Sequence, residues 1–173
     1  MSRPILLIAL ALALPATGGA VAQDTAQAVA YDAQILTACR KDTAPGDARS
    51  CIGKASAQCM KTPDGSTTVG MVSCMGQELD QWDAMLNASY AALLETTARN
   101  DGELAKLGSA AKASEPILRD AQRKWVAWRD AECSFVASKW QGGSGAGPAA
   151  TSCAMTLTAE RALALDAMRG EER

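Results

Sequence analysis

Apolar residues recur at three- and four-residue steps over about seven helical turns, beginning near Val69. This is the period of a helix with one buried face, because 3.6 residues make one turn. The positions in this stripe are Met71, Cys74, Met75, Leu79, Trp82, Met85, Leu86, Tyr90, Leu93 and Leu94. A Pro-Asp-Gly turn signal at residues 63–65 precedes the stripe, and Asn-Asp-Gly at residues 100–102 is expected to end it. The pattern predicts one long helix between these breaks.

A second long helix is predicted from residues 114–116, where a serine can cap the helix and a proline fits its first turn. Its expected buried face consists of Ile117, Leu118, Ala121, Trp125, Trp128, Cys133, Phe135 and Val136. Residues 141–150 contain four glycines and a proline, so we expect a loop there. A last helix is then expected, capped by Thr156 or Thr158.

The chain as a whole is predicted to be all-α. No segment alternates between apolar and polar residues in the manner of a strand. We expect a small disulfide-stapled helical bundle with two long helices, a C-terminal helix and short N-terminal helices within residues 31–60. Residues 23–58 are interpreted as a cysteine-containing extension, and residues 59–170 as the main helical domain.

Residues 1–22 have the layout of a secretory signal peptide. A single basic residue, Arg3, precedes an apolar run at residues 5–14, and an Ala-Val-Ala cleavage site lies at residues 20–22. The run is too short to span a bilayer, so no membrane anchor is expected after cleavage, and the protein is predicted to be periplasmic or secreted. Cleavage removes one arginine and no acidic residue, which changes the net charge from −2 to −3. This balance argues against nucleic-acid binding.

Six cysteines and no histidine occur in the chain. The cysteines are Cys39, Cys51, Cys59, Cys74, Cys133 and Cys153. An even number in an exported chain predicts three disulfides, although six cysteines allow 15 connectivities and their order does not select one. A zinc site is a weaker alternative, because no C-x-x-C pair is present. No metal or cofactor is therefore predicted.

Catalytic groups are scarce in this sequence. Without histidine there is no Ser-His or Cys-His pair. Glu78, Asp80 and Asp83 fall within two helical turns, and we interpret them as a charged, solvated helix face. The protein is not expected to be an enzyme; a hydrolytic alternative requires an activity that is lost when Glu78 or Asp83 is changed.

Three groups of residues, taken in chain order, resemble the LprI-type family of secreted or lipid-anchored bacterial domains over about residues 59–168. They are Leu86, Asn87, Tyr90 and Leu93; Leu118, Ala121, Gln122, Trp125, Arg129, Asp130 and Cys133; and Gly142, Gly143, Ser144, Cys153, Leu157, Thr158 and Arg161. The name-giving member of the family is a lysozyme inhibitor. The resemblance implies that Cys133 pairs with Cys153 and Cys59 with Cys74, which leaves Cys39 for Cys51.

The polar residues of the motif are expected to form a hydrogen-bonded network that ties the three main helices. Its members are Asn87, Tyr90, Gln122, Arg129, Asp130, Thr158 and Arg161. Arg129 suits a carboxylate partner, for which Asp80, Asp83 and Glu132 are the candidates. A ligand site is the alternative to this interhelical clamp. Trp125 and Trp128 are predicted to be core aromatic residues, with a sugar or cofactor platform as the alternative.

The family resemblance implies a protein partner, specifically a lysozyme-like muramidase inhibited by occlusion of its cleft. The candidate binding segment is the glycine loop with Lys139, Gly142, Gly143 and Ser144, because lysozyme clefts present two carboxylates. A merely permissive connection between helices is the other interpretation of this loop. The alternative function is a structural or stress-related periplasmic interaction module without effect on lysozyme.

Overall fold

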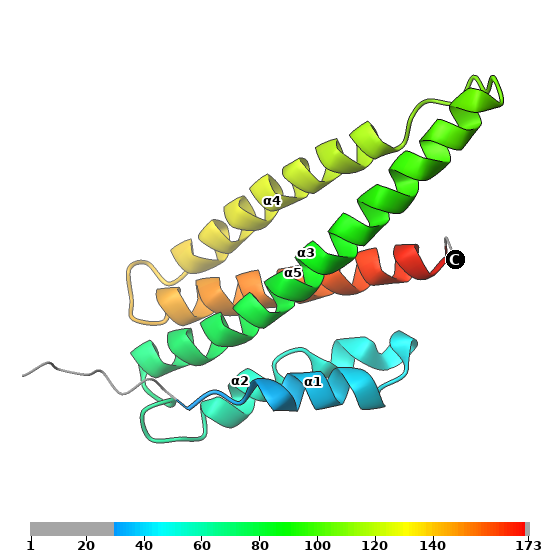
Figure 1. Ribbon diagram of the computed structural model, residues 1–173. Coiled ribbons are helices and arrows are strands. Elements are labelled where there is room, and N and C mark those ends of the chain that lie inside the picture. The colour runs from blue at the N-terminus through cyan, green and yellow to red at the C-terminus, as the bar shows by residue number, and fades with distance from the viewer. Residues whose placement is uncertain (1–29, 172–173) are drawn as a thin grey trace, which may run out of the picture.

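The fold is entirely helical over residues 30–171, the residues that the computed structural model describes (Figure 1). No strand occurs in this range, so the all-α prediction is confirmed. The elements are α1 (Ala33–Asp42), the 3-10 helix η1 (Pro45–Cys51), α2 (Lys54–Cys59), α3 (Thr68–Lys106), α4 (Glu115–Ser138) and α5 (Ala146–Glu171). None of these helices is both long and apolar enough to cross a bilayer. The predicted signal peptide, residues 1–22, lies outside the described residues.

The three long helices form one side of the molecule, and the short N-terminal helices form the other (Figure 1). The most extensive helix contact is that between α3 and α5. Buried apolar side chains at the centre of the fold include Leu36, Met75, Trp82, Leu86, Leu93, Met155, Ala159, Ala162 and Leu165. Burying each of the larger side chains stabilises the fold by roughly 1.5–3 kcal/mol. Because Leu36 lies on α1, the N-terminal helix shares this core.

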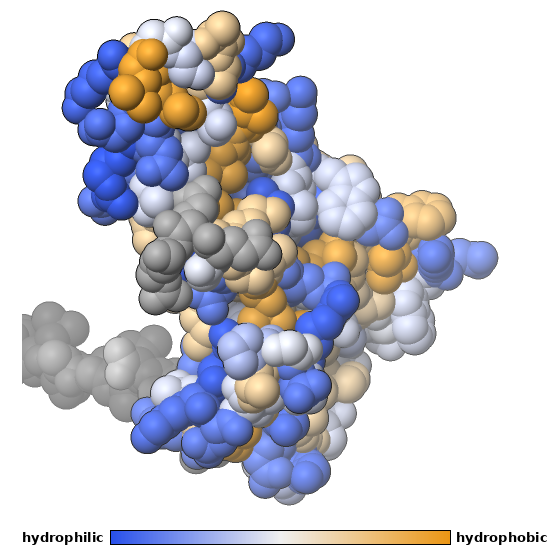
Figure 2. All heavy atoms as spheres, turned by 90° about the vertical axis from the view of Figure 1, so that its right-hand side faces the viewer, coloured by the Kyte–Doolittle hydropathy of each residue, from blue (hydrophilic) through white to orange (hydrophobic). Residues whose placement is uncertain are grey.

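The end of the bundle at which α3 leads into α4 carries exposed leucines. Leu104 and Leu107 lie here, and Leu107 is 82% exposed. Figure 2, which looks onto this side of the molecule, shows hydrophobic side chains at the top among hydrophilic ones. This end lies far along α4 from the turn that joins α4 to α5 (Figure 1).

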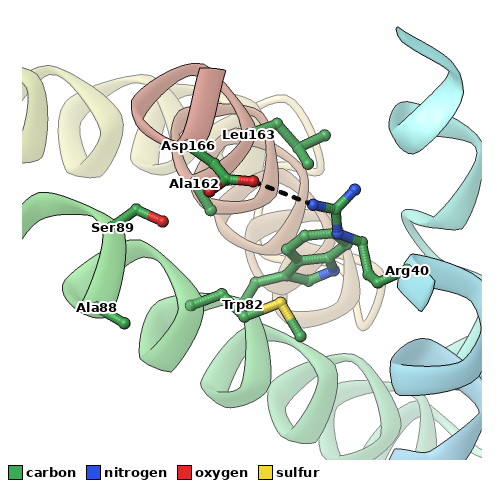
Figure 3. Close-up of a pocket in the computed structure, with 8 residues that line it drawn as sticks. Arg40, Trp82, Ala88, Ser89, Ala162, Leu163 and Asp166 are labelled. Atoms are coloured by element: carbon green, nitrogen blue, oxygen red, sulfur yellow. Dashed lines mark ion pairs between the residues drawn. The ribbon is translucent and has the colours of Figure 1, made fainter. Parts of the chain in front are cut away.

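Arg40 joins α1 to both α3 and α5 (Figure 3). Its guanidinium carbon lies 5.9 Å from the centroid of the Trp82 ring on α3. Its Nη2 lies 3.5 Å from Oδ2 of Asp166 on α5. A cation over an aromatic face adds a modest attraction to these packing contacts.

The start of α3 is fixed by a tight turn. The Thr67 side chain accepts a hydrogen bond from the amide of Gly70 at 2.9 Å, as an N-cap residue does. A Cβ atom on Gly70 would lie 1.9 Å from the carbonyl oxygen of Asp64, so only glycine fits there. The turn therefore packs directly against the first turn of α3.

The end of α3 differs from the prediction, because the helix continues through residues 100–102. The carboxylate of Asp101 accepts hydrogen bonds from the amides of Ser114 and Glu115, both at 2.8 Å. Asp101 thus caps the first turn of α4 from within α3, and these bonds offset the roughly 1 kcal/mol cost of a glycine inside a helix. The helix ends before Gly108, which adopts a positive φ of 71°.

The start of α5 also differs from the prediction. The expected loop at residues 141–150 is shorter, because α5 already begins at Ala146. Pro148 lies in the first turn of this helix, where a missing backbone N–H costs no intrahelical bond. Thr156 and Thr158 therefore lie inside α5 and do not cap it, and Thr158 is fully buried.

Three disulfides join successive elements of the chain. They link Cys39 to Cys51, Cys59 to Cys74 and Cys133 to Cys153. This is the pairing that the family resemblance implies. The sequence separations are 12, 15 and 20 residues, and closing loops of this length stabilises a fold by roughly 3 kcal/mol each. The bridges tie α1 to η1, α2 to α3, and α4 to α5.

Candidate functional site

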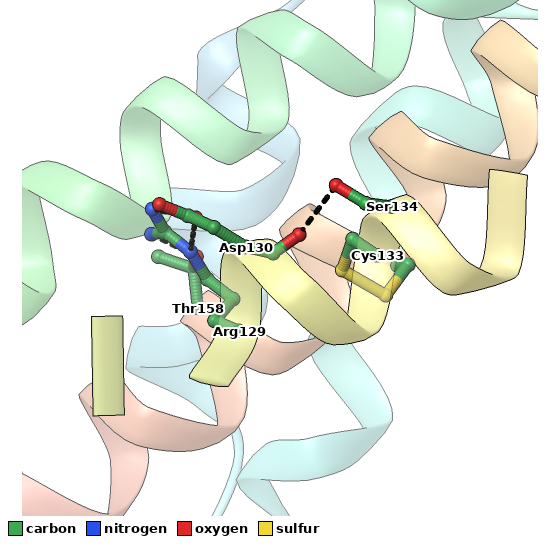
Figure 4. Close-up of polar contacts among 6 residues, drawn as sticks. Arg129, Asp130, Cys133, Ser134 and Thr158 are labelled. Carbon is green, nitrogen blue, oxygen red and sulfur yellow. Dashed lines mark hydrogen bonds and ion pairs between the residues drawn. A yellow bond between two sulfur atoms is a disulfide. The ribbon is translucent and has the colours of Figure 1, made fainter. Parts of the chain in front are cut away.

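Arg129 points from α4 toward α5 and holds a partner on each helix (Figure 4). Its Nη1 donates to the Thr158 hydroxyl at 3.2 Å, and its Nε and Nη2 donate to Oδ1 of Asp130 at 2.9 and 2.8 Å. The Thr158 hydroxyl has no other side-chain hydrogen-bond partner among the described residues. Arg129 therefore acts as an interhelical clamp, which is the interpretation favoured by the sequence pattern.

Arg161 forms a second clamp between the same helices, from the opposite direction. Its Nε donates to Oε1 of Gln122 on α4 at 2.9 Å. The guanidinium carbons of Arg129 and Arg161 lie 5.3 and 5.8 Å from the centroid of the Trp125 ring. Burial lowers the pKa of Arg161 below its ordinary value, while interaction with Tyr90 acts in the opposite direction. Trp125 thus lies beside two guanidinium groups and packs against the core.

The motif residues do not all join this network. Asn87 donates to Oδ2 of Asp83, one turn earlier on the exposed side of α3, at 2.8 Å. The hydrogen bonds of the network join α4 to α5, whereas Tyr90 on α3 is a neighbour of Arg161 and makes no hydrogen bond to it among the described residues. The expectation of Asn87 as a member is therefore wrong. The carboxylate partner of Arg129 is Asp130, the next residue in the chain, and not any of the predicted candidates Asp80, Asp83 and Glu132.

Glu78 is the main polar residue that the sequence interpretation misplaced. It is fully buried, so the prediction of a solvated position is wrong. Its carboxylate oxygens accept hydrogen bonds from the amides of Gly53 and Ser56, at 2.6 and 2.7 Å, and from Nε1 of Trp82, at 3.1 Å. Glu78 thereby caps the first turn of α2 from α3. One signal was available: Glu78 lies one turn after Cys74 and one turn before Trp82, inside the apolar stripe.

Trp128 is exposed, which corrects its prediction as a core residue. Its exposed fraction is 51%, and the values for Ile117 and Phe135 are both 57%. Viewed down the axis of α4, the side that contacts α5 is centred near Arg129 and Cys133, to one side of Trp125. Trp128 lies roughly 60° from Trp125 on the opposite side. The apolar arc of α4 is therefore wider than the surface that α5 covers. We call Ile117, Trp128 and Phe135 the outer flank of α4.

The predicted binding loop is short and open to solvent. Its four candidate residues, Lys139, Gly142, Gly143 and Ser144, are all exposed. Gly142 has a φ of 82°, which glycine adopts without strain. The Cys133–Cys153 disulfide joins the two helices close to this turn. The disulfide-linked helices α4 and α5 therefore fix both ends of the turn.

Trp140 is a further exposed aromatic residue, and the sequence interpretation did not single it out. It is 53% exposed. One face of its ring covers Gly145, since a Cβ atom there would lie 2.2 Å from a ring carbon. Nζ of Lys139 lies 4.6 Å from the centroid of the Phe135 ring. The turn after α4 is therefore continuous with the outer flank.

A shallow groove of about 440 Å³ runs between α4 and α5 near this turn. It is lined by Glu132, Val136, Ala149, Ser152, Cys153, Thr156 and Leu157. Its walls are largely apolar, and it follows the Cys133–Cys153 bridge. The outer flank, the turn and this groove offer a partner a surface built on two helices that a disulfide holds together.

The described residues contain no group of three His, Cys, Asp or Glu side chains that could hold a metal ion. Their six cysteines are all in disulfides.

Comparison with known proteins gives two matches of interest. The sequence model of a protein family described as "Lysozyme inhibitor LprI" matches residues 59–165. An uncharacterized protein of Rhizobium meliloti (strain 1021) is 29% identical over 114 residues, which are 64% of this chain and 81% of that protein. No solved structure matches. The family match covers α3, α4 and α5 as far as Leu165, and it includes Arg129 and Arg161.

Proposed function

The chain belongs to the LprI family, and from this membership together with its exposed aromatic surface we propose that it is an extracytoplasmic binding protein that inhibits a lysozyme-like muramidase. Three disulfides support a compartment in which thiols are oxidised. The family's description supplies the partner. The single observation that carries a binding role is the outer flank of α4 together with Trp140.

This surface has the composition of a protein interface. The chain has only seven aromatic residues, four Trp, two Tyr and one Phe, and Trp128, Phe135 and Trp140 are each more than half exposed. Aromatic side chains are enriched at the centres of interfaces and contribute much of their binding energy. The exposed halves of these three rings, which lie on adjoining segments, bury no apolar surface within the fold. A partner that buries them explains their position.

The mechanism that we propose is occlusion of the muramidase cleft by the turn after α4. Lys139 lies on this turn and provides a cation for the two carboxylates of such a cleft. The turn is short and is bounded by two disulfide-linked helices, so little conformational entropy is lost on binding. The net negative charge of the chain favours approach to a basic lysozyme.

The proposal is tested by titrating several lysozymes with the purified protein in a cell-wall lysis assay. We expect inhibition that saturates near one inhibitor per enzyme. Lys139→Glu should weaken inhibition by at least about tenfold, because a carboxylate then faces the cleft carboxylates. Lys112→Glu is the matched control, since it makes the same charge change in the exposed connection between α3 and α4 and should have little effect.

Lysis that is unaffected at high molar excess for every lysozyme would remove the inhibitor role. Recovery of one periplasmic partner without any lysozyme would then favour the alternative of a structural or stress-related interaction module. Equal losses for Lys139→Glu and Lys112→Glu would instead show that net charge, and not the turn, determines inhibition.

A further inference from the structure

A crevice on the other side of the molecule lies between α1, α3 and α5 (Figure 3). It has two lobes, of about 210 and 280 Å³, and both are lined by Arg40, Leu163 and Asp166. No residue of α4 or of the turn that follows it lines either lobe. The crevice is therefore separate from the surface proposed to bind a muramidase.

Among the described residues that line the crevice, two arginines face one carboxylate. Arg40 and Arg169 both pair with the single carboxylate of Asp166. Nη2 of Arg40 is 3.5 Å from that carboxylate, which is longer than a charge-assisted hydrogen bond. Beside this ion pair, the guanidinium of Arg40 lies over the ring of Trp82. The guanidinium groups of Arg40 and Arg169 therefore share the carboxylate of Asp166 within the crevice.

Arg169 also has an unused donor. Its Nε atom is buried and has no hydrogen-bond partner among the described residues. A buried N–H without an acceptor costs about 1–3 kcal/mol, so native proteins rarely leave one unpaired. A guanidinium presents its donors in a planar fork that matches a carboxylate or a phosphate. The missing component is thus an anion with oxygen acceptors.

The remaining walls of the crevice are mostly apolar. Trp82, Met85, Ala162 and Leu163 line the smaller lobe beside Arg40, and Figure 3 shows the Arg40 side chain reaching over Trp82 toward Asp166. Pockets of this kind, apolar with a few convergent polar groups, bind small molecules with a polar head and an apolar body. A fully hydrated small ion would leave these walls unused.

We propose that the crevice binds an amphipathic anion, with a carboxylate or phosphate head group at Arg40 and Arg169 and a short apolar body against Met85 and Leu163. The head group supplies the acceptor that Nε of Arg169 lacks and balances the second guanidinium. The apolar body fills the lobe between α3 and α5. An amphiphile with a cationic head is excluded by the same two arginines.

The test is isothermal titration calorimetry of the full chain with octanoate and octyl phosphate, below the concentrations at which they aggregate. We expect one saturable site for at least one of the two, and the tighter of them identifies the head group. Acetate, which has no apolar body, and octylammonium, which has the opposite charge, should not bind at the same concentrations.

Three variants locate the site. Arg169→Gln and Arg40→Lys should each weaken binding by at least about tenfold, because each removes fork donors. Arg49→Gln, an exposed arginine paired with Glu160 outside the crevice, should bind as the wild type does.

Two further variants keep the proposal testable if an arginine variant does not fold. Ala88→Phe should block the smaller lobe without touching the arginines, since Ala88 lines that lobe and is exposed on α3. Ala84→Phe, one turn earlier and also exposed, is its control. Absence of saturable binding by both anions, equal binding of octylammonium, or unchanged binding in Arg169→Gln and Ala88→Phe would overturn the proposal.

Discussion

The helix contacts inside the bundle bury polar side chains, whereas the outer flank of α4 exposes aromatic ones, which is the reverse of the usual distribution. Inside the bundle, Glu78 and Thr158 are fully buried and Arg129 is mostly buried, and all three form hydrogen bonds between helices. On the outer flank, Trp128 and Phe135 are more than half exposed. Arg129 and Arg161 of the family motif hydrogen-bond between α4 and α5, and the surface that we propose for a partner is made of residues outside that polar set.

The largest expected effect on stability is at the buried residue Glu78. Glu78→Ala should lower the free energy of unfolding by at least about 3 kcal/mol, because three N–H donors lose their acceptor. Urea denaturation measures this change. Asp80→Ala, two residues away and exposed, should stay within about 0.5 kcal/mol of the wild type. Equal values for the two variants would show that Glu78 does not hold α2 to α3.

Arg129→Ala should have an intermediate effect. We expect a loss of about 1–2 kcal/mol and a clearly lower melting temperature, since the buried Thr158 hydroxyl loses its partner and Trp125 loses a stacked cation. Arg123→Ala is the control, because the Arg123 pair with Asp120 is exposed and contributes little. An unchanged melting curve for Arg129→Ala would reject the clamp.

Tyr31 should make stability depend on pH in the alkaline range. Burial raises the pKa of Tyr31 above its ordinary value of about 10, and the charges of Glu78 and Asp32 act in the same direction. The native phenol stays protonated where the unfolded one ionises, so its stabilisation is complete below about pH 10 and declines above it. Stability of Tyr31→Phe should fall less steeply than that of the wild type above pH 10. Parallel pH profiles would contradict this assignment.

The smallest effect is expected on the outer flank. The Trp128→Ala and Phe135→Ala double variant should change the free energy of unfolding by no more than about 0.5 kcal/mol, as exposed substitutions usually do. Differential scanning calorimetry can measure this. A decrease of several kcal/mol in the free energy of unfolding would mean that these rings stabilise the fold and are not available to a partner.

The sequence predicts the helices well because their signals are local. The apolar stripe from Met71, the Pro-Asp-Gly turn before it and the proline near the start of α4 each act within one or two turns, whereas the expected cap Ser114 makes no side-chain cap bond. The disulfide pairing follows from the family resemblance and not from spacing. It is correct because each bridge joins neighbouring elements.

The errors arise where a distant partner decides the outcome. Asp101 keeps α3 helical past a glycine because it caps α4, and Glu78 is buried because α2 presents two free amides to it. Trp128 is exposed because α5 covers only part of the apolar arc of α4. Helical periodicity shows that a residue belongs to an apolar arc, but it does not show how much of that arc a neighbouring helix covers.

The most direct test of the contrast between scaffold and surface is the dissociation constant for an inhibited lysozyme, measured for the wild type, the Trp128→Ala and Phe135→Ala double variant, and Arg129→Ala. At a temperature at which all three are folded, we predict at least about tenfold weaker binding for the double variant and wild-type affinity for Arg129→Ala. Wild-type affinity for the double variant, together with lost affinity for folded Arg129→Ala, would place the binding site in the motif and contradict the account.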